Sequence, residues 1–97
     1  MAKEIEIRKK AVRELTGKGW IIWYPAKVRY KQNDIFGIID LLALRKKKMR
    51  YIQLTTLPNV ARQRKKILNF FKNEKVKLPV EIWVWSKKKK KFKTEIV

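Results

Sequence analysis

Apolar residues near the start of the chain recur at the spacing of an amphipathic helix. The stripe lies between charged residues and comprises Ile7, Ala11, Val12 and Leu15. Residues three and four positions apart lie on one face of a helix. The pattern therefore predicts a helix over residues 3–16, which ends at Gly17 and Gly19.

The next three segments have the apolar patterns of strands. Residues 20–24 are rich in β-branched and aromatic side chains and end at Pro25. Residues 35–45 form an almost continuous apolar run, which is typical of a strand covered on both faces. A strand over 49–55 follows after the charged turn 46–48, so these two strands are expected to form a hairpin.

The second half of the chain predicts another helix and two more strands. Pro58 or Asn59 begins this helix, with Thr56 or Asn59 as the candidate cap. Its apolar face comprises Val60, Ile67, Phe70 and Phe71, and its opposite face carries Arg62, Lys65, Lys66 and Lys72. Strands are predicted over 80–85 and 92–97. The order predicts a single α/β domain over 1–97, with a mixed central sheet flanked by two helices.

The charge balance points to a polyanionic partner. The chain has 97 residues, with 27 Lys and Arg against 8 Asp and Glu, which gives a formal charge of +19. Repulsion on that scale opposes compaction, so nucleic acid is the simplest reason to carry it. Thermophilic composition is an alternative, although thermophile surfaces usually balance Lys with Glu. A membrane surface is disfavoured, because no segment joins a basic face to a strongly apolar one.

The composition also excludes several kinds of site. Cys and His are absent, which excludes disulfides, thiolate nucleophiles, zinc sites with His or Cys ligands, and Ser-His triads. Catalysis would have to use carboxylates, Lys, Tyr or a hard metal ion bound through oxygen. Residues 1–10 lack the apolar stretch of a signal peptide, and the run 35–44 is too short to span a bilayer. An intracellular, cytoplasmic protein is expected.

Asp40 is the most informative residue, because it interrupts the apolar run of residues 38–42. Burying a carboxylate costs several kcal/mol unless it is paired or bound to a metal. Its position therefore indicates a site, with an Asp at a bulge that accepts backbone N–H groups or pairs with an Arg as the alternative. Gln53 and Thr55 share one face of the next strand by period-two alternation. If the two strands pair, these residues and Asp40 meet at one end of the hairpin.

The segment FGIIDLLAL, followed by RYIQLTT, resembles the motif of the PD-(D/E)xK nuclease superfamily, and most closely that of its archaeal Holliday-junction-resolvase branch. The resemblance covers roughly residues 4–72. It implies a restriction-endonuclease-like αβββαβ core with an additional C-terminal strand, a DNA substrate rather than RNA, and a homodimer. It also implies a Mg²⁺ or Mn²⁺ site formed by Asp40, Gln53 and the main-chain carbonyl of Leu54.

Two residues depart from the family pattern. Gln53 stands where the family has a second acidic residue, and a neutral amide oxygen binds Mg²⁺ more weakly than a carboxylate does. Thr55 stands at the position of the catalytic Lys and has neither its charge nor its proton affinity. Arg64, within the apolar arc of the second helix, is the candidate to reach the site as partner of Asp40 or of a phosphate. Alternatively, Arg64 extends its guanidinium group to water.

The family also has a Glu on its first helix, and Arg8 occupies the matching position here. Glu4, one turn away, is the candidate substitute. Asp34 is a further candidate acid, or a turn residue in the Asn33–Asp34 pair. Candidate nucleic-acid contacts are the loop residues Lys27, Arg29, Tyr30 and Lys31, and the helix residues Arg62, Lys65 and Lys66.

The other conspicuous groups have structural interpretations. Lysines 87–91 are expected to form a solvated hairpin tip that discourages edge aggregation. Trp83 and Trp85 share one strand face, which favours a packed core or a dimer interface over base stacking.

Three functions stay open on the sequence alone. The leading hypothesis is a nuclease-superfamily domain that binds DNA and hydrolyses phosphodiesters with Mg²⁺ or Mn²⁺. The second is an inactive binding module on the same fold, with its site eroded at Gln53 and Thr55. The third, a basic ribosome- or chromatin-associated structural protein, explains the charge but leaves a buried Asp40 without a reason.

Overall fold

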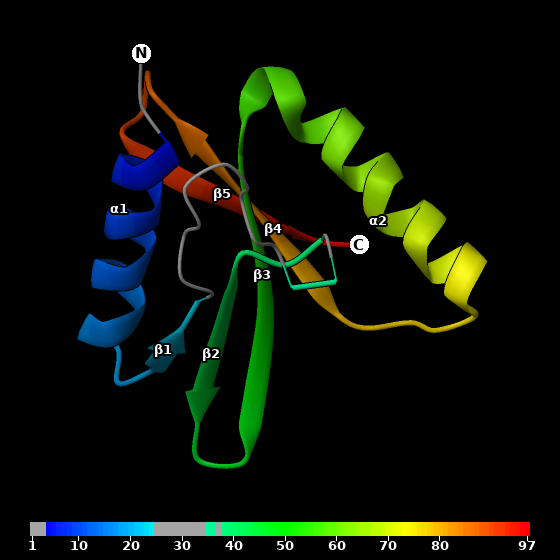
Figure 1. The fold of residues 1–97 in the computed structure, drawn as a ribbon. Coiled ribbons are helices and arrows are strands. Elements are labelled where there is room, and N and C mark those ends of the chain that lie inside the picture. The colour runs from blue at the N-terminus through cyan, green and yellow to red at the C-terminus, as the bar shows by residue number, and fades with distance from the viewer. Residues whose placement is uncertain (1–3, 25–34, 37) are drawn as a thin grey trace.

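The computed structural model describes residues 4–24, 35–36 and 38–97. Along the chain, the elements are α1 (Glu4–Gly17), β1 (Ile21–Trp23), β2 (Leu41–Arg45), β3 (Lys48–Thr56), a short 3-10 turn η1 (Leu57–Asn59), α2 (Val60–Glu74), β4 (Val80–Ser86) and β5 (Lys91–Ile96). Figure 1 shows these elements as an α/β arrangement with one central sheet. The predicted order of helices and strands is confirmed.

The five strands lie in the sheet in the order of the chain, β1-β2-β3-β4-β5. Neighbouring strands are antiparallel except β3 and β4, which are parallel. Parallel strands need a long crossover connection, and α2 provides it here. The strand β3 therefore has an antiparallel neighbour on one side and a parallel neighbour on the other.

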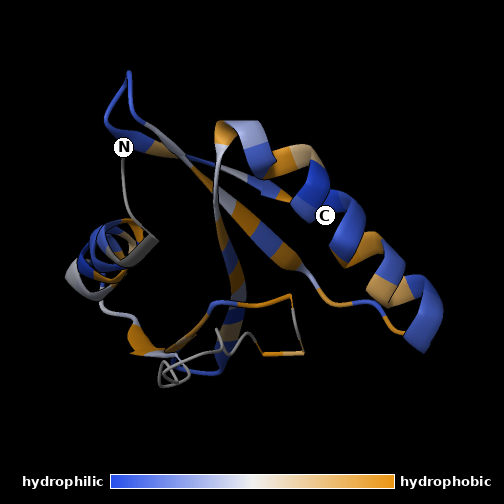
Figure 2. Ribbon diagram, turned by 45° about the horizontal axis from the view of Figure 1, so that its top comes forward, coloured by the Kyte–Doolittle hydropathy of each residue, from blue (hydrophilic) through white to orange (hydrophobic). Residues whose placement is uncertain are grey.

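Each helix covers a different face of this sheet, which produces three layers. On one face, α1 packs its stripe against a cluster of strand residues that comprises Leu41, Ala43, Ile52, Leu54 and Trp83. On the other face, Ile67 and Phe71 of α2 pack in a cluster with Ile38, Ile39, Val80, Ile82 and Val84. Figure 2 shows apolar and hydrophilic positions alternating along α2, as expected for a helix that packs one face on the sheet and exposes the other. The apolar faces predicted for both helices are confirmed.

The strand predicted over 35–45 is shorter in the structure, because β2 begins only at Leu41. Ile35 and Ile39 instead form an isolated antiparallel bridge at a turn: the N–H of Ile35 donates to the carbonyl of Ile39 over 2.7 Å, and the N–H of Ile39 donates to that of Ile35 over 3.0 Å. Phe36 in this turn has a φ of 55°. Ile38 and Ile39 are buried within the α2 cluster. A continuous apolar run indicates burial without indicating extended backbone, which is why the sequence pattern placed the strand too early.

A part-buried ion pair stands among the aromatic residues on the α1 face. The Nε of Arg50 donates to Oε2 of Glu81 over 2.8 Å, and the guanidinium group lies 5.0 Å from the ring centre of Trp20 and 5.5 Å from that of Trp83. The indole of Trp83 also donates to Glu81, over 3.2 Å. The Trp83 ring is buried and packs against Phe92, so the predicted core role of Trp83 is confirmed.

Stability should fall at acid pH through Glu81. Burial acts to raise the pKa of Glu81, but hydrogen bonds from Arg50 and Trp83, together with the Arg50 charge, outweigh it and hold the pKa below its usual value. A carboxylate of this kind adds stability above its unfolded pKa of roughly 4.3, and the contribution is lost as the pH falls through the folded pKa. We expect the free energy of unfolding to decrease as the pH falls below about 4.3, and to decrease less steeply for Glu81→Gln.

Urea denaturation between about pH 3 and 7 measures this slope. Glu74→Gln removes an exposed carboxylate at the end of α2 and controls for the loss of charge alone. Equal slopes for the parent protein and Glu81→Gln would contradict the assignment.

Candidate functional site

The sheet opens between β2 and β3 at Asp40. Pairing of these strands ends at Leu41 and Ile52, while β3 continues to Thr56 against β4 alone. The N–H of Asp40 donates to the carbonyl of Ile52 over 2.8 Å. One step further along β3, Oδ2 of Asp40 accepts the N–H of Leu54 over 2.8 Å. The carboxylate thus takes the place that a carbonyl group of β2 would occupy in a continued ladder.

The sequence placed Asp40 inside a fully covered strand, and this was wrong. Asp40 lies at the bend that precedes β2, and it is half-buried. The alternative interpretation, an Asp that accepts a backbone N–H, describes the observed contact with Leu54. The bend turns the carboxylate toward the strand edge, where an N–H group needs an acceptor because β2 has ended.

Gln53 and Thr55 lie on the α2 face of β3, and both are buried. The amide nitrogen of Gln53 donates to Oε1 of Gln63 on α2 over 3.3 Å and lies 3.5 Å from the carbonyl oxygen of Leu54. Its Oε1 is buried and has no hydrogen-bond partner among the described residues. An unsatisfied buried acceptor costs about 1–3 kcal/mol, so this oxygen is available to a bound cation or donor.

These residues supply oxygen donors of the kind that Mg²⁺ or Mn²⁺ binds: a carboxylate at Asp40, an amide oxygen at Gln53 and the carbonyl of Leu54. Asp40 lies beside the end of the Leu41–Ile52 pair, with its N–H on the carbonyl of Ile52 and its carboxylate on the N–H of Leu54, the two residues that flank Gln53. Only one of the three donors is charged. Within the described residues, no group of three or more His, Cys, Asp or Glu side chains is placed to hold a metal ion. The donor set therefore fits a hard cation in kind, but it is poor in charge.

Of the remaining predicted catalytic residues Thr55, Glu4 and Asp34, the structure describes only the side chain of Thr55. The hydroxyl of Thr55 donates to the carbonyl of Thr56 over 3.4 Å. Because this hydroxyl is neutral, Thr55 does not supply the positive charge of the Lys in the family motif. Glu4 begins α1, and its side chain lies outside the described part of the structure. Asp34 lies outside the described residues as well.

Arg64 does not have the predicted role of partner to Asp40. Its Nε and Nη2 donate to the two carboxylate oxygens of Glu95 on β5, over 3.0 and 2.7 Å. The hydrogen bond from Arg64 also holds the pKa of Glu95 below its usual value. Glu95 stands opposite Ile82 on the sheet face that α2 covers, so the pair ties α2 to the last strand.

Sequence reasoning missed Gln63, the residue that holds the amide of Gln53. Gln63 is half-buried and lies one helical turn before the buried Ile67. A polar residue at that position within an apolar arc was the available signal, because it requires a polar partner on the opposing strand.

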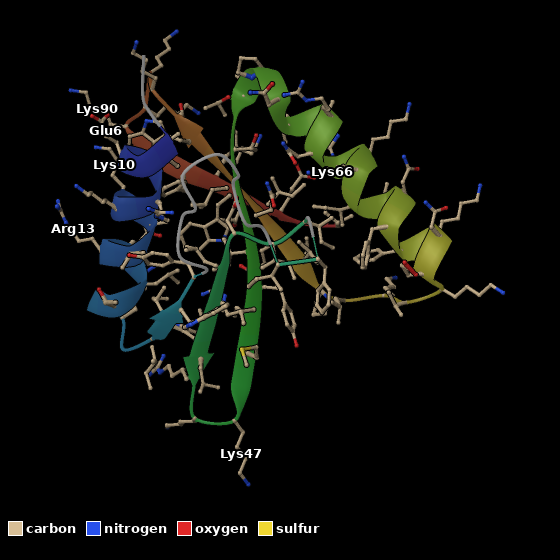
Figure 3. The ribbon with its side chains drawn as sticks, in the orientation of Figure 1. Glu6, Lys10, Arg13, Lys47, Lys66 and Lys90 are labelled. Atoms are coloured by element: carbon tan, nitrogen blue, oxygen red, sulfur yellow. The ribbon has the colours of Figure 1, made fainter. Side chains whose placement is uncertain are left out.

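The predicted nucleic-acid contacts fall into two groups. Lys27, Arg29, Tyr30 and Lys31 lie outside the described residues. Arg62, Lys65 and Lys66 are exposed on α2, where Arg62 also donates to Asn59 over 3.0 Å. Further cations mark the outer side of α1 and both hairpin tips, as Figure 3 shows for Lys10, Arg13, Lys47 and Lys90.

Substitutions at Asp40 separate its structural role from its charge. Asp40→Ala leaves the N–H of Leu54 without its acceptor, so we expect the free energy of unfolding to fall by about 1–3 kcal/mol. Asp40→Asn keeps an oxygen that accepts this N–H, and its cost should be clearly smaller. Urea unfolding of both variants measures the difference. Equal destabilisation by the two substitutions would show that the carboxylate charge, and not the hydrogen bond to Leu54, carries the stabilisation.

Comparison with known proteins assigns no family. No protein-family model matches the sequence, and no curated protein matches it significantly. In the described part of the chain, neither helix is long and apolar enough to cross a membrane. An assignment of function therefore depends on the charge, the fold and the geometry around Asp40.

Proposed function

We propose that this protein binds nucleic acid, DNA rather than RNA, on a restriction-endonuclease-like core whose metal site is weak. The observation that carries the proposal is the formal charge of +19 on 97 residues. Two of the acidic residues, Glu81 and Glu95, are engaged in ion pairs with Arg50 and Arg64. The lysines at the hairpin tips, 46–48 and 87–91, are exposed. A polyanion along such a surface relieves the repulsion between these charges.

The topology supports the choice of fold. A helix, three antiparallel strands, a crossover helix and a strand parallel to the third make up the first six major elements. This is the order that the resemblance implies, with β5 as the additional C-terminal strand. The opening between β2 and β3 also falls at Asp40 and Gln53, the residues that the resemblance assigns to the site.

The same residues support only weak hydrolysis. When bound, a divalent ion would polarise the phosphate, and a second group must position the attacking water. Asp40, Gln53 and the carbonyl of Leu54 would hold that ion. Compared with the family motif, Gln53 removes one negative charge and Thr55 removes one positive charge, so the net charge of the site is unchanged while its affinity for metal falls. The homodimer that the resemblance implies is part of the same proposal.

Binding should depend steeply on salt. The logarithm of the affinity for duplex DNA is expected to fall with the logarithm of salt by about 0.9 for each phosphate neutralised. Replacing Arg62, Lys65 and Lys66 together by Ala should weaken binding and reduce the slope by roughly one for each phosphate that the variant no longer neutralises. The control replaces Lys72, Lys75 and Lys77, which removes the same charge from the last turn of α2 and the segment that follows it. Fluorescence anisotropy measures both slopes, and an affinity independent of salt would remove the proposal.

Cleavage should be weak in the natural sequence and require Mn²⁺ rather than Mg²⁺. The double substitution Gln53→Glu with Thr55→Lys restores the family motif and should raise the rate. Asp40→Asn should abolish calorimetric Mn²⁺ uptake while leaving duplex affinity nearly intact. The assay uses labelled single-stranded, duplex and four-way-junction DNA. Robust Mg²⁺-dependent cutting by the parent protein would contradict the account of Thr55, since that account leaves the site without the cation of the family motif.

A further inference from the structure

Among the described residues, α2 leaves part of its side of the sheet exposed, where β1, β2 and β3 extend past the helix. Ile21, Leu44 and Met49 form one row across these strands, because Ile21 pairs with Leu44 and Leu44 with Met49. Paired residues of neighbouring strands share a sheet face. Their exposed fractions are 68, 37 and 42%. We call the surface formed by this row and the next one the hairpin face.

The next row of the hairpin face comprises Trp23, Leu42 and Tyr51. Trp23 is 57% exposed, while Leu42 and Tyr51 are the partly buried margin of the α2 cluster. In Figure 1 the β2–β3 hairpin extends beyond the ends of both helices, which is why α2 leaves these rows uncovered. A contiguous exposed apolar surface that includes a Trp is typical of a binding surface.

The hairpin tip next to this face is basic. Arg45, Lys46, Lys47 and Lys48 follow one another at the hairpin tip, and all are exposed. Arg45 pairs with Lys48 and alternates with Leu44, so this pair lies on the α1 side, while Lys46 and Lys47 form the turn that borders the hairpin face. Figure 3 shows Lys47 projecting away from the molecule. The sequences of β1, β2 and β3 contain no Asp or Glu. A second copy docked on this face would bring the same cations against this tip, so the local charge favours an anionic partner here over another copy of the chain.

An exposed ring beside aliphatic side chains and a basic edge suits one class of anion in particular. The bases of a duplex are stacked on one another. A flat protein surface can therefore contact only the phosphates and groove edges of a duplex, and not its base faces. Unpaired nucleotides offer both a base face, which packs on aromatic side chains, and a phosphate, which lysines neutralise. The hairpin face supplies the matching pair of features.

We infer that the hairpin face binds single-stranded nucleic acid, with bases against Trp23 and the aliphatic row and phosphates at the turn residues Lys46 and Lys47. The inference rests on the proposed function and adds to it the substrate class and its place of contact. The register also defines a line on the surface that leads from this face to the opening at Asp40. Along the α2 face of β3, the positions Met49, Tyr51 and Gln53 follow at two-residue steps of roughly 6.6–6.8 Å. The row of Trp23 is therefore one step from the opening at Asp40.

The test compares two single strands that have the same phosphates. The full chain is titrated by anisotropy against a labelled oligothymidylate, an abasic strand of equal length, and a duplex. We expect the parent protein to bind oligothymidylate more tightly than the abasic strand. Trp23→Ala should weaken oligothymidylate binding by about 5- to 100-fold and remove that preference, with duplex affinity changed less than about twofold.

Two further variants keep the result interpretable. Trp23→Tyr retains an aromatic face and should largely restore the preference, which a merely unfolded protein would not do. Ile96→Ala removes an apolar side chain that is 71% exposed at the opposite edge of the sheet and should leave all three affinities unchanged.

The outcomes separate this inference from the proposed function. Equal binding of oligothymidylate and the abasic strand, together with salt-dependent duplex binding, would overturn the hairpin face and leave nucleic-acid binding standing. Absence of binding to all three probes would remove both. A parent protein that sediments as a dimer, with Trp23→Ala as a monomer, would show that the face joins two copies and would overturn the inference. Uptake onto anionic phospholipid vesicles that oligothymidylate does not compete would overturn it in favour of a lipid surface.

Discussion

The hydrogen bond from the N–H of Leu54 to Asp40 marks the place on which the functional architecture depends. The central strand β3 pairs with β2 over only part of its length, whereas β4 accompanies it to Thr56. A strand edge that opens inside a sheet leaves N–H and C=O groups that need partners. The Asp40 carboxylate satisfies one of them without closing the gap. Polar side chains can therefore stand at the centre of an otherwise apolar sheet, and Gln53 does so with an oxygen that has no hydrogen-bond partner in the described structure.

Most of the positive charge on the protein is not balanced by ion pairs with acidic residues. Arg50 joins β3 to Glu81 of β4, and Arg64 joins α2 to Glu95 of β5, each through a bidentate pair. These acidic residues therefore stabilise the fold and do not balance the surface charge. The lysines at the hairpin tips and on the helices are left to repel one another. Marginal stability is then maintained by two apolar clusters, one beneath each helix, rather than by surface ion pairs, which contribute little individually.

Sequence patterns predicted the parts of the fold that depend on local periodicity. The stripe of Ile7, Ala11 and Leu15 located the buried face of α1, and the order of helices and strands followed from similar signals. The same reasoning failed where buried residues do not have the extended backbone of a strand. Ile38 and Ile39 are buried in a turn rather than in a strand.

The candidate site was harder to predict, because its contacts join distant segments. An arginine in an apolar arc needs an acid, and Asp40 was the conspicuous choice in the sequence. Glu95 is the actual partner of Arg64, which depends on the register of β5 and on the packing of α2. A local sequence pattern contains neither the register of β5 nor the packing of α2. The contact between Gln53 and Gln63 was missed for the same reason.

The placement of polar and exposed apolar positions along β3 connects the opening with the surface beside it. Residues at two-residue steps share a face, so Met49 and Tyr51 of the hairpin face lie in line with Gln53 and Thr55. Exposure falls along this line, from 42% at Met49 to 4% at Gln53 and 7% at Thr55. An extended strand that lay on the exposed end would therefore meet increasing enclosure as it approached Asp40. The site around Asp40 has little charge and would hold a metal ion only weakly. Contacts on the hairpin face, remote from the reacting centre, can position a phosphate that a weakly held metal ion alone cannot position.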